Sequence, residues 1–130
     1  YDAKGENILD KNARNSLRVL RIQKLFPDVK FIHIIRDGRA VANSWRNYSI
    51  RTKKTDRTIE GAAYQWVHYV SYIRKHRKFL NNYSEIRYED VCARYRGMDS
   101  RNNKWKTMSD EDVTTVTKIQ EPLLKELGYL

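Results

Sequence analysis

The chain has 130 residues, the size of one ordinary domain, and 40% of them are hydrophobic, which is enough for a packed core. Lysine and arginine number 26 against 16 acidic residues, so the formal net charge is +10 and a polyanionic partner is favoured: nucleic acid, an anionic membrane, a sulfated glycan or a phosphorylated small molecule. The single cysteine, Cys92, excludes an intrachain disulfide and a cysteine-based zinc site. With no bilayer-length apolar run and no signal-peptide pattern, we expect a cytoplasmic protein, and a removed leader or tether stays open.

The first elements are predicted to be a helix and a buried strand. Asn15 or Ser16 is expected to begin the helix, and Pro27 stops it. Residues 31–35 form a nearly continuous apolar run, which is typical of a strand covered on both faces. Asp37 then predicts the N-cap of a second helix, on which five residues recur at helical spacing: Ala40, Val41, Ser44, Trp45 and Tyr48.

The second half predicts a long helix, a short strand and a final helix. The long helix should run over residues 58–80, after a basic loop at 50–58, and residues 85–88 read as a strand. Acidic residues after Ser109 indicate the last helix, which Pro122 is expected to break. Strands that alternate with helices predict an α/β fold, with a mainly parallel sheet flanked by helices in one domain over 1–130.

The strand-to-helix junction carries the strongest candidate for chemistry. Arg36 follows the predicted strand, where parallel sheets bind ligands, and Arg39 and Ser44 follow in the helix. A guanidinium fork, helix-start N–H groups and a hydroxyl together could hold a phosphate. The structural alternative, weighed equally, is that Arg36 pairs with Asp37 or Glu89 and that Ser44 merely packs.

Three further segments hold candidate ligands. Tyr88 follows the second strand and could contact a nucleobase, although it could equally be a core tyrosine. Arg101 and Lys104 form a second cationic group, which could also be a solvated loop. Lys11 could neutralise an anion that is transferred, or belong to an ordinary polar helix start. No metal site is expected, because the histidines lack acidic or cysteine partners at ligand spacing.

Taken together, these segments resemble the sulfotransferases that use 3′-phosphoadenosine 5′-phosphosulfate (PAPS), and most closely their bacterial-type branch. The long segment 26–45 resembles the 3′-phosphate-binding segment of that family and is the specific motif. Lys-Asn-Ala-Arg-Asn-Ser at 11–16, Arg-Tyr-Glu-Asp at 87–90 and Arg-Asn-Asn-Lys-Trp-Lys at 101–106 resemble its other motifs, in the same order. The ending Leu-Lys-Glu-Leu-Gly-Tyr at 124–129 is also similar to the family.

The resemblance implies a partial P-loop-NTPase-like sulfotransferase fold and transfer of a sulfuryl group from PAPS to an acceptor hydroxyl or amine, leaving 3′-phosphoadenosine 5′-phosphate (PAP). It implies that Arg36 and Ser44 bind the 3′-phosphate, that Tyr88 contacts adenine and that Arg101 closes over the phosphate. Lys11 would lie near the sulfuryl group. The acceptor is unknown and could be anionic. Whether the chain forms an oligomer is a separate open question.

The chain departs from the family in its glycines. None of Gly5, Gly38, Gly61, Gly97 and Gly128 opens a phosphosulfate loop, and the 90–101 connection is short. Three explanations of the missing loop stay open. The chain could be the ordered part of a longer protein, it could be a truncated or diverged relative, or a second chain could supply the missing half. The functional alternatives are a non-catalytic PAP-binding module and a basic nucleic-acid-binding α/β domain, although no specific nucleic-acid motif is present.

Overall fold

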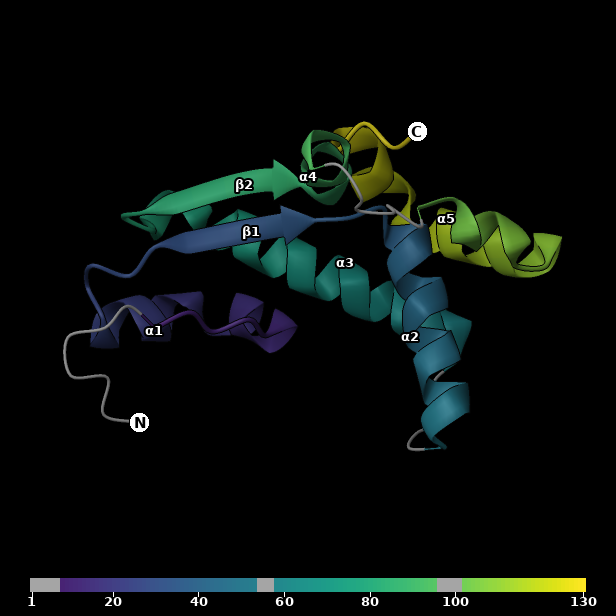
Figure 1. Ribbon diagram of the computed structural model, residues 1–130, viewed down its shortest axis with the longest axis horizontal. Helices are drawn as coiled ribbons and strands as arrows, with labels where there is room; N and C mark the ends of the chain where they lie inside the picture. The colour runs from purple at the N-terminus through teal and green to yellow at the C-terminus, as the bar shows by residue number, and fades with distance from the viewer. Residues whose placement is uncertain (1–7, 54–57, 96–101) are drawn as a thin grey trace.

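A computed structural model describes residues 8–53, 58–95 and 102–130 of the chain as helices around a small sheet (Figure 1). In chain order the elements are η1 (Ala13–Leu17), α1 (Val19–Leu25), β1 (Phe31–Ile35), α2 (Gly38–Thr52), α3 (Ile59–His76), η2 (Arg77–Phe79), β2 (Tyr83–Arg87), α4 (Tyr88–Arg94), η3 (Asn102–Thr107) and α5 (Asp110–Glu126), where η marks a 3-10 helix. Within these ranges no helix is long and apolar enough to cross a membrane. The predicted α/β class is confirmed.

The two strands pair in parallel, and one face of the sheet is covered. Phe31 pairs with Tyr83 and Ile35 with Arg87, so both strands end at the same edge. The inward side chains pack against α3, where Ile35 contacts the cluster of Trp66 and Val70. On the other face Ile32 and Ile34 are 63% and 54% exposed in the structure. The prediction of a strand covered on both faces is therefore met on one face only.

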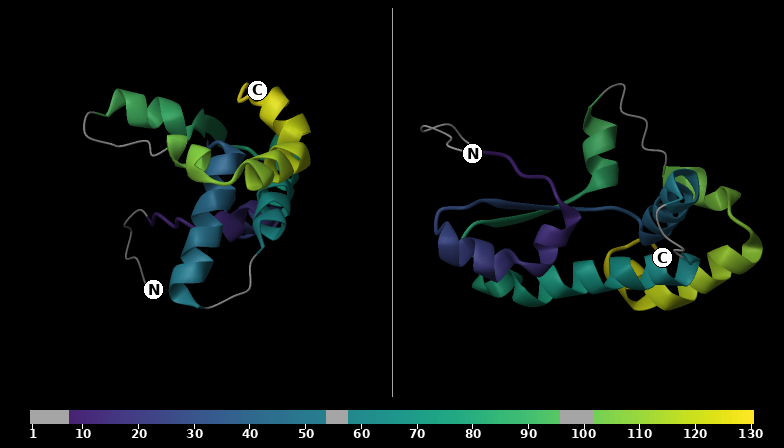
Figure 2. Two further views of the ribbon diagram at one scale, coloured as in Figure 1. Left: turned by 90° about the vertical axis from the view of Figure 1, so that its right-hand side faces the viewer. Right: turned by 90° about the horizontal axis from the view of Figure 1, so that it is seen from below.

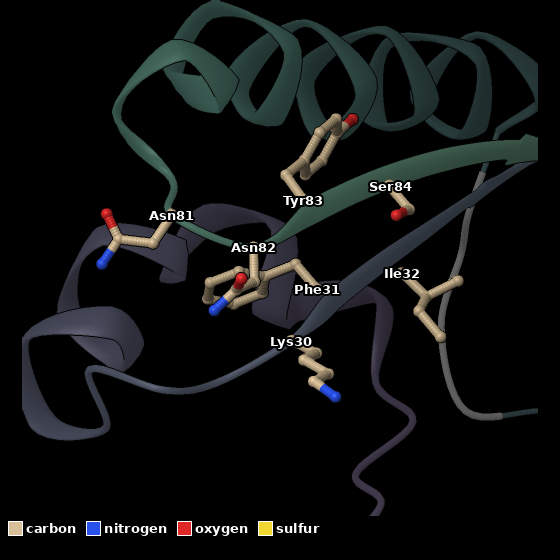
Figure 3. Close-up of a pocket in the computed structure, with 7 residues that line it drawn as sticks. All are labelled: Lys30, Phe31, Ile32, Asn81, Asn82, Tyr83 and Ser84. Atoms are coloured by element: carbon tan, nitrogen blue, oxygen red, sulfur yellow. The ribbon is translucent and has the colours of Figure 1, made fainter.

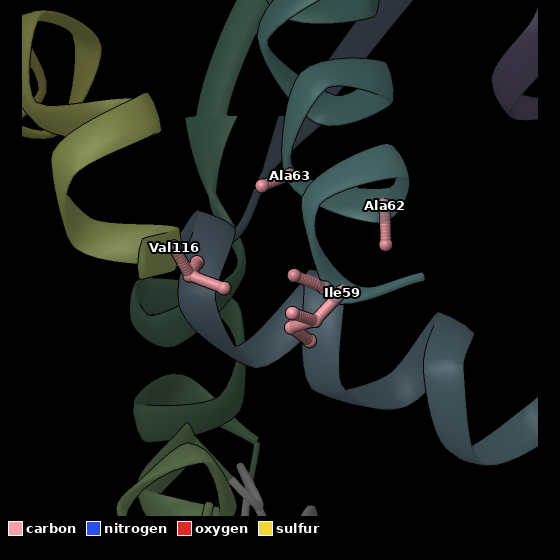
Figure 4. Close-up of a cluster of buried hydrophobic side chains, with 5 residues drawn as sticks. Ile59, Ala62, Ala63 and Val116 are labelled. Carbon is pink, nitrogen blue, oxygen red and sulfur yellow. The ribbon is translucent and has the colours of Figure 1, made fainter. Parts of the chain in front are cut away.

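Helix α3 is the centre of the core, as its apolar spacing predicts. Thr58 begins it by accepting a hydrogen bond from the Gly61 N–H. Figure 4 shows Ile59, Ala62 and Ala63 near Val116 of α5, and Val116 is fully buried. Small alanines at these positions let α2 and α5 approach α3 closely. Figure 2 shows, from a second direction, that α3 runs along the length of the molecule.

Three local predictions were wrong. The first helical segment is split into η1 and α1, and Asn12 rather than Asn15 or Ser16 caps η1 through its side chain. Tyr88 is the first residue of α4 and does not end the strand. Helix α5 continues through Pro122, because Leu124 behind it is fully buried in the core and holds the last turns in place.

Candidate functional site

The carboxyl edge of the sheet brings together Arg36 and Tyr88. Because Ile35 pairs with Arg87, the next residue of each strand lies at the same edge. The Arg36 guanidinium carbon lies 4.9 Å from the centre of the Tyr88 ring. Both side chains are partly buried, so neither is fully shielded from solvent. Two predicted cofactor ligands, which are 52 positions apart, therefore meet in space.

The start of α2 lies directly beside this pair. Asp37 is its N-cap, as predicted, and its carboxylate accepts a hydrogen bond from the Arg39 N–H. The Asp37 N–H donates to Glu89 Oε1 over 3.1 Å. A carboxylate of α4 therefore already satisfies one of the helix-start N–H groups on which the phosphate hypothesis depended.

Arg39 is placed differently from Arg36. It is 8% exposed, and its guanidinium forms a fork with Asp37 at 3.1 and 2.8 Å. The same group donates to the backbone oxygen of Tyr129 over 3.1 Å and stacks on Trp105 at 4.0 Å. Binding of a phosphate by Arg39 stays a prediction, and it would require the guanidinium to leave Asp37. In the geometry observed, Arg39 therefore connects the start of α2 to Trp105 and to Tyr129.

Lys104 and Ser44, two further predicted site residues, lie at exposed positions. The backbone oxygen of Lys104 accepts a hydrogen bond from the Asn43 side chain over 3.0 Å, which attaches η3 to α2. Its ammonium group is exposed, as is the side chain of Ser44, the neighbour of Asn43 on α2. A cation on η3 and a hydroxyl on α2 are therefore both exposed to solvent.

Lys11 and Arg101 are the remaining predicted site residues. Lys11 is exposed and lies just before Asn12, which caps η1, and η1 packs on α3. Arg101 lies outside the described residues. Their functional assignments therefore stay predictions.

Tyr129 is a site residue that the motif pattern did not single out. Its hydroxyl donates to Glu89 over 2.7 Å and approaches the Ile35 oxygen at 3.4 Å. Its ring lies under the Arg87 guanidinium at 4.5 Å. Burial, and then the hydrogen bond to Glu89, raises the pKa of the Tyr129 phenol well above its usual value. The sequence signal was only the family-like ending at 124–129.

A second polar network lies beneath the sheet, away from the edge. His33 Nδ1 is 2.8 Å from the Tyr83 hydroxyl, which donates to Glu85, and Glu85 accepts from Arg74. Burial lowers the pKa of His33 despite the opposing effect of Glu85. His33 is thus a bonded core histidine, as its place in the apolar strand suggested. No cluster that could hold a metal ion occurs among the residues described.

Comparison with known proteins gave a match to a protein family. The model of a family described as "Sulfotransferase family" matches residues 1–100 of the chain. No curated protein and no solved structure matches it. The matched region includes both strands, Arg36, Ser44 and Tyr88, but ends before Lys104.

Proposed function

Because the chain belongs to the sulfotransferase family, we propose that it transfers a sulfuryl group from PAPS to an acceptor hydroxyl or amine, with PAP as the second product. One observation carries the proposal: Arg36 stacks on Tyr88 at the carboxyl edge of a parallel sheet. That edge is where open α/β sheets bind nucleotides, and the pair offers one group for a phosphate and one for a base.

The residues at the edge suit the 3′-phosphoadenosine end of PAPS. The Arg36 guanidinium can donate two parallel hydrogen bonds to a phosphate, and the exposed Ser44 hydroxyl can donate a third. Tyr88 presents an aromatic ring to adenine, and Lys104 adds an exposed cation. The 130 residues include no glycine-rich loop for the phosphosulfate end, so we derive no contact to that end.

PAPS supplies an activated sulfur–oxygen bond when it is bound. The work of the chain would be electrostatic and positional: Arg36, Ser44, Tyr88 and Lys104 bind the nucleotide, and Arg101 closes over its 3′-phosphate. Lys11 would help to neutralise the sulfuryl group that is transferred. Arg39 would support this site by holding Trp105 and η3 against α2. A location in the cytoplasm and an anionic acceptor belong to the same proposal.

Calorimetry with PAP tests the nucleotide site. Arg36→Ala should weaken PAP binding by at least about tenfold, because it removes a charge-assisted fork, and Ser44→Ala by about threefold to tenfold. Arg51 gives a matched control, since its guanidinium also stacks on a tyrosine, Tyr48, at 5.8 Å, in the last turns of α2. Arg51→Ala should bind PAP like the unaltered chain.

Equal losses of PAP affinity in the Arg36 and Arg51 variants would contradict the proposed nucleotide site. Absence of PAP binding, together with RNA binding that falls steeply with salt, would assign the chain to the basic nucleic-acid-binding class instead. Transfer of labelled sulfate from PAPS to a mixture of hydroxyl and amine acceptors then separates an enzyme from a PAP-binding module, which would bind PAP without turnover.

A further inference from the structure

The end of the molecule opposite the carboxyl edge exposes large apolar side chains beside basic ones. Leu25 is 63%, Phe26 64% and Phe79 57% exposed, although each has a hydrophobic side chain. Figure 1 shows the end of α1 and the starts of both strands at this end, away from α2 and α4. We define the amino-end surface as Arg21, Lys24, Leu25, Phe26, Lys78 and Phe79.

The α1 residues and the η2 residues of the amino-end surface are held together by Gln23 of α1. The side chain of Gln23 on α1 donates to the Phe79 backbone oxygen over 2.9 Å and accepts from the Asn81 N–H over 2.7 Å. Leu25 and Phe26 follow Gln23 closely in the chain, so they and Phe79 belong to one end of the fold. Figure 3 shows Lys30 and Asn81 at the same end, beside the first residues of the strands.

The exposed apolar side chains are not needed to fill the core at this end. The core here is the cluster of Val19, Ile73 and Leu80, which are at most 9% exposed. On α1, Val19 faces this cluster, while Arg21, Lys24 and Leu25 are exposed. Helix α1 therefore turns Val19 toward the core and exposes both cations and a leucine to solvent.

The charge at this end is strongly positive. Residues 18–30 hold four basic side chains against one acidic side chain, Asp28. Lys78 and Arg77 add two cations from η2, and the Lys78 ammonium lies 5.0 Å from the Phe79 ring. A soluble polyanion would account for the cations but not for three exposed apolar side chains beside them.

We propose that the amino-end surface binds an anionic lipid membrane. Leu25, Phe26 and Phe79 would enter the headgroup region, and the surrounding lysines and arginines would face acidic headgroups. The chain would lie on the membrane without crossing it, and the carboxyl edge, at the other end of the strands, would point away from the lipid. This binding is independent of the nucleotide site.

Flotation with lipid vesicles tests the proposal. The chain should float with phosphatidylcholine vesicles that contain about one third phosphatidylserine, and not with phosphatidylcholine alone. Arg21→Glu/Lys24→Glu should weaken binding by at least about 25-fold, since each cation near the surface strengthens it about fivefold. The control Arg51→Glu/Lys118→Glu has the same net charge but changes exposed residues of α2 and α5, and it should bind nearly as well as the unaltered chain.

The apolar contribution needs its own variant. Leu25→Ser/Phe26→Ser/Phe79→Ser should lose vesicle binding while it keeps the circular dichroism and the PAP affinity of the unaltered chain, which shows that fold and nucleotide site are intact. Vesicle binding that survives this triple substitution would overturn the proposal, because charge alone would then account for the binding and the apolar side chains would have no part in it. Equal losses in the two charge-reversed pairs would overturn it as well, because binding would then follow net charge alone.

Discussion

The Tyr129 hydroxyl donates a hydrogen bond of 2.7 Å to the Glu89 carboxylate, and this contact joins the last residues of the chain to the start of α4. The other oxygen of Glu89 accepts the Asp37 N–H, and the Tyr129 backbone oxygen accepts from Arg39. The end of the chain is therefore bonded to both segments that form the carboxyl edge. Residue Tyr129 therefore contributes to the site by holding in place the backbone segments that carry Arg36 and Tyr88.

Tyr129→Phe should destabilise the fold and change its behaviour in alkali. Loss of the hydroxyl removes a hydrogen bond to a carboxylate, for a loss of about 1–2 kcal/mol of unfolding free energy in urea denaturation. The folded state raises the pKa of this phenol above its usual 10.0, so the stability it contributes is full below about pH 10 and is lost as the pH rises further.

The variant should therefore lose less stability above pH 10 than the unaltered chain does. Tyr64→Phe is the control, because Tyr64 is 62% exposed. If both variants keep the original alkaline slope, Tyr129 is not the group responsible.

Gly38→Ala should destabilise the chain by about 1–3 kcal/mol in the same measurement, as overpacking of a core does. A Cβ at Gly38 would overlap Gln120 Oε1 and would lie 2.8 Å from Trp66, so α2 could no longer begin so close to α3 and α5. Gln120 is fully buried and has little room to move.

Gly61→Ala is the matched control, since its Cβ would meet only the Thr58 hydroxyl, at 3.4 Å. It should be neutral or stabilise the chain by up to about 1 kcal/mol, because alanine favours a helix. A Gly38 variant as stable as the Gly61 variant would contradict the close packing.

Arg39→Ala should cost about 3–5 kcal/mol of unfolding free energy, because it leaves the Asp37 carboxylate buried without its ionic partner. Arg39→Lys should recover only part of the loss, since an ammonium cannot form the fork to Asp37 and also reach the Tyr129 oxygen. The double variant Arg39→Ala/Asp37→Asn should be more stable than Arg39→Ala alone. A fully stable Arg39→Ala chain would show that the ion pair is dispensable.

His33 should make the fold sensitive to mild acid. Burial lowers its pKa below the ordinary 6.5, so the unfolded chain takes up a proton at this residue more readily than the folded chain. The unfolding free energy should fall as the pH decreases below about 6.5. Glu85, Tyr83 and Arg74 face His33, and of these Glu85 opposes the fall because it raises the pKa of His33.

His33→Phe should make the acid limb of the stability curve shallower in denaturation measured from pH 7 to 5. His68→Asn, at an exposed position of α3, should leave that limb unchanged. A limb that depends on His68 rather than on His33 would contradict the assignment.

Local sequence patterns determined most of the elements. Apolar patterns predicted β1 and α3, and capping residues marked where three helices begin. Asp37, Thr58 and Ser109 each accept an N–H at the start of α2, α3 and α5, as their side-chain chemistry favours. These features depend on residues within a few positions of one another, so the sequence reveals them directly. The position of Arg36 at a strand end followed from the same patterns.

Tertiary structure decided which partners each charged group has. Arg36 and Arg39 are three positions apart and equally basic, yet one stacks on Tyr88 at the sheet edge and the other is buried between Asp37 and Trp105. The partners that separate them come from α4, η3 and the end of the chain, which are brought near only by the parallel register and the packing on α3. A local pattern predicts a helix or a strand; the partners of a charged side chain depend on distant residues, whose approach is fixed only when the core is packed.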